Sequence, residues 1–161
     1  MSIKVGDKMP KGQFTVMGAN GPEPLTTDQL FNGKKVVLFS VPGAFTPTCS
    51  MKHLPGFVDK AADIRAKGVD TIACMAVNDV FVMSAWGKSS NVGDNVLMLS
   101  DGNGEYAKAL GLELDASKFG MGKRSQRFSI IVDDGVVEKL NIEPAGQFGV
   151  SSADTALAQL A

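Results

Sequence analysis

Short apolar runs alternate along the chain with segments in which apolar positions follow a helical spacing. Three runs have the length and β-branched content of buried strands, at residues 35–41, 71–77 and 96–100. Helical spacing and start signals predict helices at residues 26–31, 47–66, 79–88, 105–111 and 151–160. Two further runs, 128–133 and 136–141, flank Asp134-Gly135, a dipeptide typical of a tight β-hairpin turn.

This order of elements predicts an α/β fold. Right-handed crossovers make the first three strands parallel, and the hairpin adds antiparallel strands at one edge. A thioredoxin-like fold, with a mixed central sheet and helices on both faces, fits this order. A flavodoxin-like sheet would need another parallel strand in place of the hairpin. At 161 residues the chain is expected to form one domain, residues 1–161.

Composition and charge exclude several classes of protein. Sixteen Lys and Arg against seventeen Asp and Glu argue against nucleic acid or an anionic membrane as the main partner. The first residues lack the apolar stretch of a signal peptide and no run is long enough to span a bilayer, so we expect a cytoplasmic protein. Two cysteines without a CxxC pair or a Cys/His cluster indicate neither a disulfide scaffold nor a metal site.

The segment VPGAFTPTCS, residues 41–50, connects a predicted buried strand to a predicted helix. It therefore lies at the carboxyl end of a strand, where open α/β sheets bind ligands. Thr46 suits the N-cap and Pro47 the first helical position, which places Cys49 in the first turn. Free N–H groups and the helix dipole favour a thiolate there, so Cys49 is a candidate nucleophile. The alternative is a small, buried apolar side chain.

A few other residues are candidates to assist Cys49. The Thr46 hydroxyl, one turn earlier, can donate and accept hydrogen bonds. His53 shares the helical face of Cys49, but a packed or capping histidine is favoured over a Cys–His pair. Arg127 immediately precedes a predicted core strand and is either a cation that points into the cleft or an ordinary surface residue. Pro55 predicts a kink in the helix, because it frees a carbonyl one turn earlier.

The cysteine segment resembles the active-site loop of the peroxiredoxins, whose pattern is Pro-x-x-x-Thr-x-x-Cys. Pro42, Thr46 and Cys49 match that pattern residue by residue. The longer blocks at 42–57, 74–87 and 127–144 resemble the type II, peroxiredoxin-5-like subfamily. The resemblance extends over nearly the whole chain, in three separated blocks.

The resemblance implies a thiol peroxidase of antioxidant defence that reduces hydrogen peroxide and alkyl hydroperoxides with no metal or organic cofactor. Cys49 would attack the O–O bond, release water or an alcohol, and become a sulfenic acid. Thr46 would hydrogen-bond the thiolate and the peroxide, and Arg127 would favour the thiolate and stabilise the transition state. Pro42 would shield the site from water. Gly43 and the backbone N–H of Cys49 would contribute further substrate contacts.

The second cysteine leaves the reduction step open. Some type II members have a resolving cysteine late in the chain, but the matching residues here, 148–152, include serines and no cysteine. Cys74 follows Cys49 by 25 residues, a spacing found in similar plant and bacterial forms, yet it lies in a predicted buried strand. We therefore expect a one-cysteine cycle with glutathione and glutaredoxin, or thioredoxin, as the reductant. Cys74 remains a possible second redox cysteine.

Related members form homodimers that pack near the active site, and the same is expected here. Phe45, Phe81 and Trp86 are candidate contacts, although each could equally be a core residue.

Other functions have weaker support from the sequence. A thioredoxin-fold disulfide oxidoreductase would need a CxxC pair, and a non-enzymatic binding module would show no peroxide turnover that depends on Cys49. The glycines at 102–104 and 120–122 lack the full pattern of a nucleotide site. One basic cluster would either attract an anionic reductant such as glutathione or form a solvated loop: Lys118, Lys123, Arg124 and Arg127.

Overall fold

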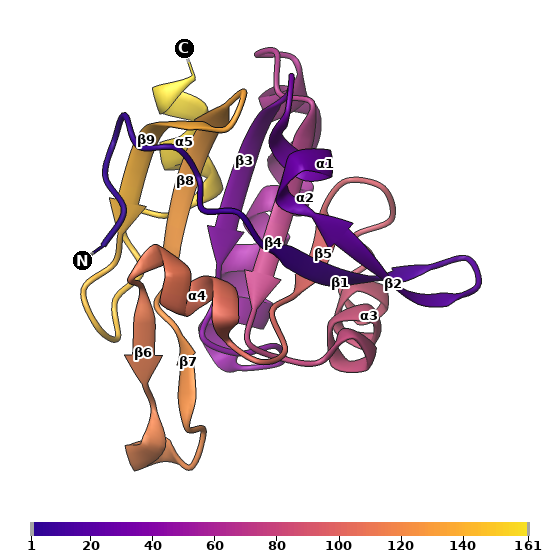
Figure 1. Ribbon diagram of the computed structural model, residues 1–161, viewed down its shortest axis with the longest axis vertical. Coiled ribbons are helices and arrows are strands. Elements are labelled where there is room, and N and C mark those ends of the chain that lie inside the picture. The colour runs from indigo at the N-terminus through magenta and orange to yellow at the C-terminus, as the bar shows by residue number, and fades with distance from the viewer. Residues whose placement is uncertain (1, 161) are drawn as a thin grey trace.

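The computed structural model describes residues 2–160 and contains one large mixed sheet (Figure 1). Its strands follow the order β2-β1-β5-β4-β3-β8-β9. The three central strands are parallel: β3 (Lys35–Ser40), β4 (Thr71–Ala76) and β5 (Leu97–Ser100). Four antiparallel strands flank them: β1 (Gln13–Gly18) and β2 (Gly21–Thr26) on one side, β8 (Phe128–Asp133) and β9 (Val136–Ile142) on the other.

Helices cover both faces of this sheet, as the sequence predicts. One layer contains α2 (Leu54–Arg65), α3 (Val80–Ser89) and α5 (Ala153–Gln159), and the other contains α1 (Thr27–Phe31) and α4 (Glu105–Leu110). Alternate residues of β3 serve the two layers, because successive side chains of a strand point to opposite faces. Phe39 packs in the α2 layer and Leu38 in the α1 layer. The thioredoxin-like α/β architecture is confirmed.

Two hairpins were not predicted from the sequence. Strands β1 and β2 pair along their full length, although Pro22 and Pro24 argue against a central strand. The structure resolves this conflict by placing β2 at the edge of the sheet, where proline is tolerated. A second hairpin, β6 (Glu113–Asp115) and β7 (Lys123–Ser125), projects away from the sheet with the short helix η2 (Ser117–Phe119) near its tip (Figure 1).

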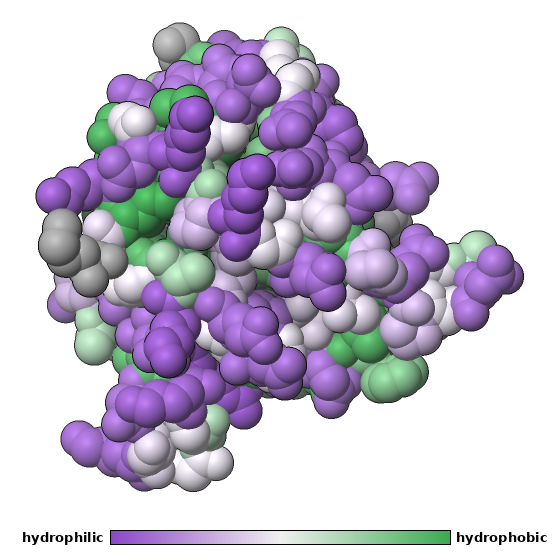
Figure 2. Space-filling model, in the orientation of Figure 1, coloured by the Kyte–Doolittle hydropathy of each residue, from purple (hydrophilic) through white to green (hydrophobic). Residues whose placement is uncertain are grey.

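The surface seen in the same orientation is mostly hydrophilic, with only small apolar areas between polar side chains (Figure 2). Within residues 2–160, no helix has the length and apolar character that a membrane span requires.

The predicted helix at 47–66 is divided into two parts. Residues Cys49–His53 form the π-helical turn η1, and α2 begins only at Leu54. The N–H of Leu54 donates to the carbonyl of Cys49, five residues earlier. Pro55 occupies the first turn of α2, where its missing N–H is tolerated. The interruption that proline predicts is therefore a π-helical turn that starts at Cys49.

Candidate active site

Cys49 lies where β3 has ended and the next helix starts, and its side chain is fully buried. The guanidinium of Arg127 reaches it from the start of β8, the strand that pairs with β3. Arg127 Nη2 donates to Cys49 Sγ at 2.9 Å, and the guanidinium also lies 5.8 Å from the ring centre of Phe148. A cation in direct contact with sulfur favours the thiolate over the thiol. The structure thus places the candidate nucleophile and the candidate cation together.

The Thr46 hydroxyl does not cap the following helix. It donates instead to the carbonyl of Gly43 at 2.7 Å and so closes the loop before Cys49. Gly43 is closely packed, because a Cβ there would lie 3.1 Å from the end of the Met121 side chain and 3.2 Å from Thr46 Cγ2. Two of the residues predicted for substrate contact, Thr46 and Gly43, therefore belong to one tightly folded loop.

A second hydrogen bond also holds this loop in place. The N–H of Ala44 donates to Oδ1 of Asn78 at 2.9 Å. Phe45 has a φ of 65°, in the left-handed region that side chains other than glycine rarely adopt, and its ring is 54% exposed. The loop thus presents an aromatic ring to solvent beside the site.

A cavity of about 370 Å³ opens next to Arg127. Pro42 and Thr48 line it from the cysteine loop, and Leu114 and Pro144 add apolar surface. Cys49 is not among its lining residues. This cavity leaves room for a small substrate beside the guanidinium. Its volume lies within the usual range of small-molecule sites.

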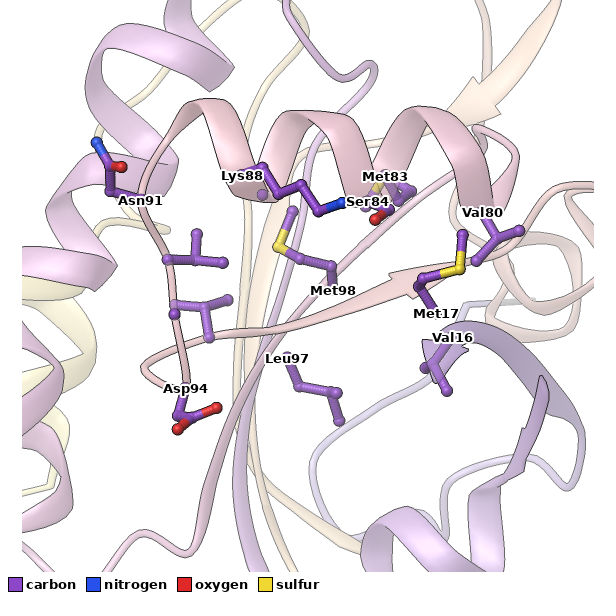
Figure 3. A pocket seen from close by; sticks show the side chains of 14 residues that line it. Val16, Met17, Val80, Met83, Ser84, Lys88, Asn91, Asp94, Leu97 and Met98 are labelled. Carbon is purple, nitrogen blue, oxygen red and sulfur yellow. The ribbon is translucent and has the colours of Figure 1, made fainter. Parts of the chain in front are cut away.

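A larger hollow, of about 610 Å³, lies between α3 and strands β1 and β5 (Figure 3). Met17 and Met98 point toward it from the two strands, and Lys88 lies across it from α3. None of the residues around Cys49 lines this hollow. Its size alone therefore does not make it the site of the chemistry.

His53 is a packed histidine, as favoured from the sequence, but it also contacts Arg127. Its ring lies against Phe39 and Phe148, with ring centres 4.9 Å apart in each case. Nε2 lies 2.9 Å from the carbonyl of Ser151, which can only accept, so Nε2 carries the proton. Nδ1 then accepts from Arg127 Nη1 at 2.7 Å. Burial and the charge of Arg127 lower the pKa of His53 to about 3, which keeps the ring neutral.

Glu143 and Ser151 have no role in the sequence analysis, yet they complete this network. Oε2 of Glu143 accepts from the hydroxyl of Ser151 at 2.7 Å, and from the N–H groups of Gly149, Val150 and Ser151 at 2.8 Å each. Burial raises the pKa of Glu143, but these hydrogen bonds outweigh it and leave the pKa below its usual value. Three of the four donors are backbone groups, so the sequence carries no signal for them.

Cys74 lies in the middle of β4, beside Phe39 on β3 and Met98 on β5. It is fully buried in the same apolar layer as Cys49, and both cysteines are free. Burial raises the pKa of the Cys74 thiol, and the nearby Cys49 adds to that effect. The expected burial of Cys74 is confirmed.

Trp86 was either a dimer contact or a core residue, and the structure supports the core residue. The side chain is buried in the core, and its ring N–H donates to the hydroxyl of Ser50 at 2.9 Å. Phe81, by contrast, is 65% exposed on α3.

The basic cluster is divided between two environments. Lys123 lies on the projecting hairpin within 3.5 Å of Asp115. Arg124 turns back to the main sheet, where its Nη1 donates to the carbonyl of Val77 at 3.2 Å. Of the cluster, Arg127 is the member that contacts Cys49. Among residues 2–160, no group of three His, Cys, Asp or Glu side chains is placed to hold a metal ion.

Comparison with known proteins agrees with the geometry. Residues 4–157 match the model of the Redoxin family. The chain is 51% identical over 163 residues to Peroxiredoxin-2E, chloroplastic, of Arabidopsis thaliana, covering 99% of this chain and 70% of that protein. It is 50% identical to Peroxiredoxin-2B of the same plant, covering 98% of both. The structure of reduced Prx3 in complex with H2O2 from Vibrio vulnificus superimposes with a TM-score of 0.95, at 50% identity over 99% of both chains.

A thiol set against a guanidinium at the carboxyl end of a thioredoxin-like sheet is thus accompanied by extensive sequence similarity. The chain belongs to the peroxiredoxins, within the Redoxin family, and specifically to the type II group. It is a thiol-dependent peroxidase with an antioxidant function.

Proposed function

We propose that Cys49 is the thiol that reduces the peroxide and that Arg127 is its activating cation. The observation that carries this assignment is the 2.9 Å contact between Arg127 Nη2 and Cys49 Sγ. Cys74 has no such partner among the described contacts, and burial raises the pKa of its thiol.

The reaction balances with the Cys49 thiolate, the hydroperoxide and one proton from solvent. The Cys49 thiolate attacks the terminal oxygen of the hydroperoxide, an S–O bond forms and the O–O bond breaks. Sulfur is oxidised to the sulfenic acid and the peroxide is reduced. The departing oxygen takes a proton from solvent and leaves as water or an alcohol. Arg127 stabilises the negative charge as it moves from sulfur to the leaving oxygen.

The loop before Cys49 orients the substrate in this proposal. Because the Thr46 hydroxyl donates to the Gly43 carbonyl, its own oxygen is left to accept a hydrogen bond from the peroxide O–H. Pro42 lines the adjacent cavity and limits the access of water. Gly43 and the N–H of Cys49 supply the remaining substrate contacts.

Peroxide consumption by the wild type and by C49S and C74S tests the assignment. C49S is expected to lose all turnover, and C74S to retain it with a monothiol reductant. Turnover by C49S would contradict the role proposed for Cys49. Loss of turnover in C74S, with C49S still active, would show that Cys74 is the reactive thiol.

The reductant is proposed to be glutathione with glutaredoxin, or thioredoxin, in a one-cysteine cycle. Support comes from the position of Cys74 in the middle of a strand, where it is held by neighbours on both sides. Side-by-side assays of the wild type and C74S with each reductant distinguish the two systems. A requirement for Cys74 with both reductants would instead indicate an intramolecular disulfide.

We further propose a homodimer that packs through the exposed rings of Phe45 and Phe81. Both rings lie beside the active-site loop or on the neighbouring helix, and their exposure to water is unfavourable in a monomer. Sedimentation of the wild type and of F81D, compared at the same concentration, measures the oligomeric state. A wild type that is monomeric at micromolar concentration would refute the dimer.

A cytoplasmic location is also part of the proposal. Both cysteines are free, which fits a reducing compartment. Fractionation of the cells that produce the protein, with detection by antibody, tests this location.

A further inference from the structure

One continuous series of hydrogen bonds connects Glu143 to the sulfur of Cys49. It runs from the Glu143 carboxylate to Ser151, from the Ser151 carbonyl to His53, and from His53 to Arg127. Arg127 then donates its second terminal nitrogen to sulfur. In each bond only one of the two partners can donate, because a carboxylate and a carbonyl only accept and a guanidinium only donates. The tautomer of His53 and the direction of every bond are therefore fixed.

The surroundings of Glu143 are unusual for a carboxylate so close to an arginine. Its backbone N–H donates to the carbonyl of Arg127 at 3.0 Å, so the two residues are neighbours just beyond the paired ends of β8 and β9. No ion pair involves Glu143 among residues 2–160. Four donors from residues 149–151 converge on its Oε2 instead.

This arrangement has one consequence for Arg127 and another for the carbonyl of Ser151. A carboxylate is a strong partner for a guanidinium, but no ion pair joins Glu143 to Arg127 within residues 2–160, and Oε2 of Glu143 accepts from four other donors. The guanidinium is therefore left to the sulfur of Cys49 and to a neutral histidine. At the same time, the Ser151 carbonyl is fixed at the position where it accepts from His53.

We propose that Glu143 is a positioning residue for the Cys49–Arg127 pair and that it acts through Ser151 and His53. Glu143 holds the loop at 149–151, the loop holds His53 with its proton on Nε2, and His53 presents the Nδ1 lone pair to Arg127. When Glu143 is removed, the ring loses its fixed acceptor and is free to change tautomer. Arg127 then loses the hydrogen bond from Nη1 to His53 that aims Nη2 at the sulfur. The proposal rests on Cys49 being the reactive thiol.

The first test compares E143A, E143D and E143Q with E23A, a control on the edge strand β2. Two quantities are measured on the reduced, folded proteins: the thiolate absorbance across pH and the rate of reaction with one equivalent of hydrogen peroxide. In E143A the rate and the ratio of thiolate to thiol at neutral pH are expected to fall about tenfold, the effect of one hydrogen bond to a charged group. E143D, which is too short to reach all four donors, changes in the same direction.

E143Q keeps an oxygen that accepts from the backbone N–H groups, so it is expected to stay within about twofold of the wild type. A purely structural role for Glu143 predicts a different result, namely a lower melting temperature with the wild-type thiolate fraction and rate. That result in folded E143A or E143D would overturn the proposal.

A double-mutant cycle with H53L tests the route. If Glu143 acts through His53, E143A has little further effect on the rate once His53 is replaced. Equal effects of E143A in the wild-type and H53L backgrounds would refute the route through His53. Failure of the enzymatic assignment is recognised separately, because the wild type itself would then react slowly and C49S would not alter the thiolate signal.

Discussion

The two cysteines share one apolar layer and neither is exposed, yet their surroundings differ in other respects. Cys74 lies in the middle of a central strand, and burial raises the pKa of its thiol. Cys49 lies where regular backbone has ended and a π-helical turn begins, with a guanidinium 2.9 Å from its sulfur. Burial therefore does not distinguish the two thiols. What distinguishes them is that the guanidinium of Arg127 reaches the sulfur of Cys49.

Oxidation by limiting peroxide gives the largest contrast between the two thiols. One equivalent of hydrogen peroxide, added to the reduced wild type, is expected to oxidise Cys49 roughly a hundred times faster than Cys74, because a guanidinium contacts the sulfur of Cys49 and burial raises the pKa of the Cys74 thiol. Trapping of the sulfenic acid with dimedone, followed by peptide mass spectrometry, measures both sites. Comparable labelling of Cys74 would show that the contrast drawn from the structure is wrong.

Replacement of Arg127 is expected to reduce the difference in reactivity between Cys49 and Cys74. R127Q is expected to lower the rate of peroxide reduction about a hundredfold, the usual effect of losing one charged donor at a transition state. The matched control is R124Q, because Arg124 bonds to the carbonyls of Met121 and Val77 and not to Cys49. Rapid-mixing kinetics on the reduced proteins give both rates. An equal loss in R124Q would indicate that general positive charge matters, and not the contact with sulfur.

The pH dependence of stability tests whether buried His53, which contacts Arg127, stays neutral in the folded protein. The pKa of His53 is near 6.5 in the unfolded chain and about 3 in the folded protein. Below pH ~6.5 the unfolded state binds a proton that the folded state does not, so the free energy of unfolding falls as pH falls. This contribution is complete above pH ~6.5 and is lost by about 1.4 kcal/mol per pH unit toward pH 3.

Denaturant titrations of the wild type and H53Q between pH 7 and pH 5 measure this slope. H53Q lacks the titrating ring, so its stability is expected to depend less on pH in that range. Parallel pH profiles for the two proteins would mean that His53 is protonated as readily in the folded state as in the unfolded state.

The sequence could predict those strands whose pattern is local, and not those whose pairing depends on the rest of the sheet. The strands β3, β4 and β5 are continuous apolar runs, and β8 and β9 flank a turn whose Asp134 and Gly135 both have positive φ, so local pattern identified all five. In the hairpin β1–β2, the edge strand β2 contains two prolines, and the pairing depends on a sheet that the local pattern does not show.

The candidate site divides in the same way. Pro42, Thr46 and Cys49 lie within eight residues of one another, so a local motif contains them. The contact of His53 with Arg127 joins residues 74 positions apart, and it follows from the pairing of β3 with β8. Glu143 was missed because its partners are mostly backbone N–H groups, which every residue except proline possesses.

Substitution of Cys74 has the smallest expected effect and is the most direct test of its inert role. C74V keeps an apolar side chain of similar volume, so it is expected to change the free energy of unfolding by less than about 1.5 kcal/mol. C74S buries a hydroxyl among apolar neighbours and is expected to lose about 1–3 kcal/mol unless that hydroxyl finds a partner. Both variants should reduce peroxide within about twofold of the wild-type rate, because Cys74 is not among the groups that contact the Cys49 sulfur. A C74V protein that is as stable as the wild type but slow toward peroxide would show that Cys74 takes part in the chemistry, and the distinction between the two thiols would then have to be abandoned.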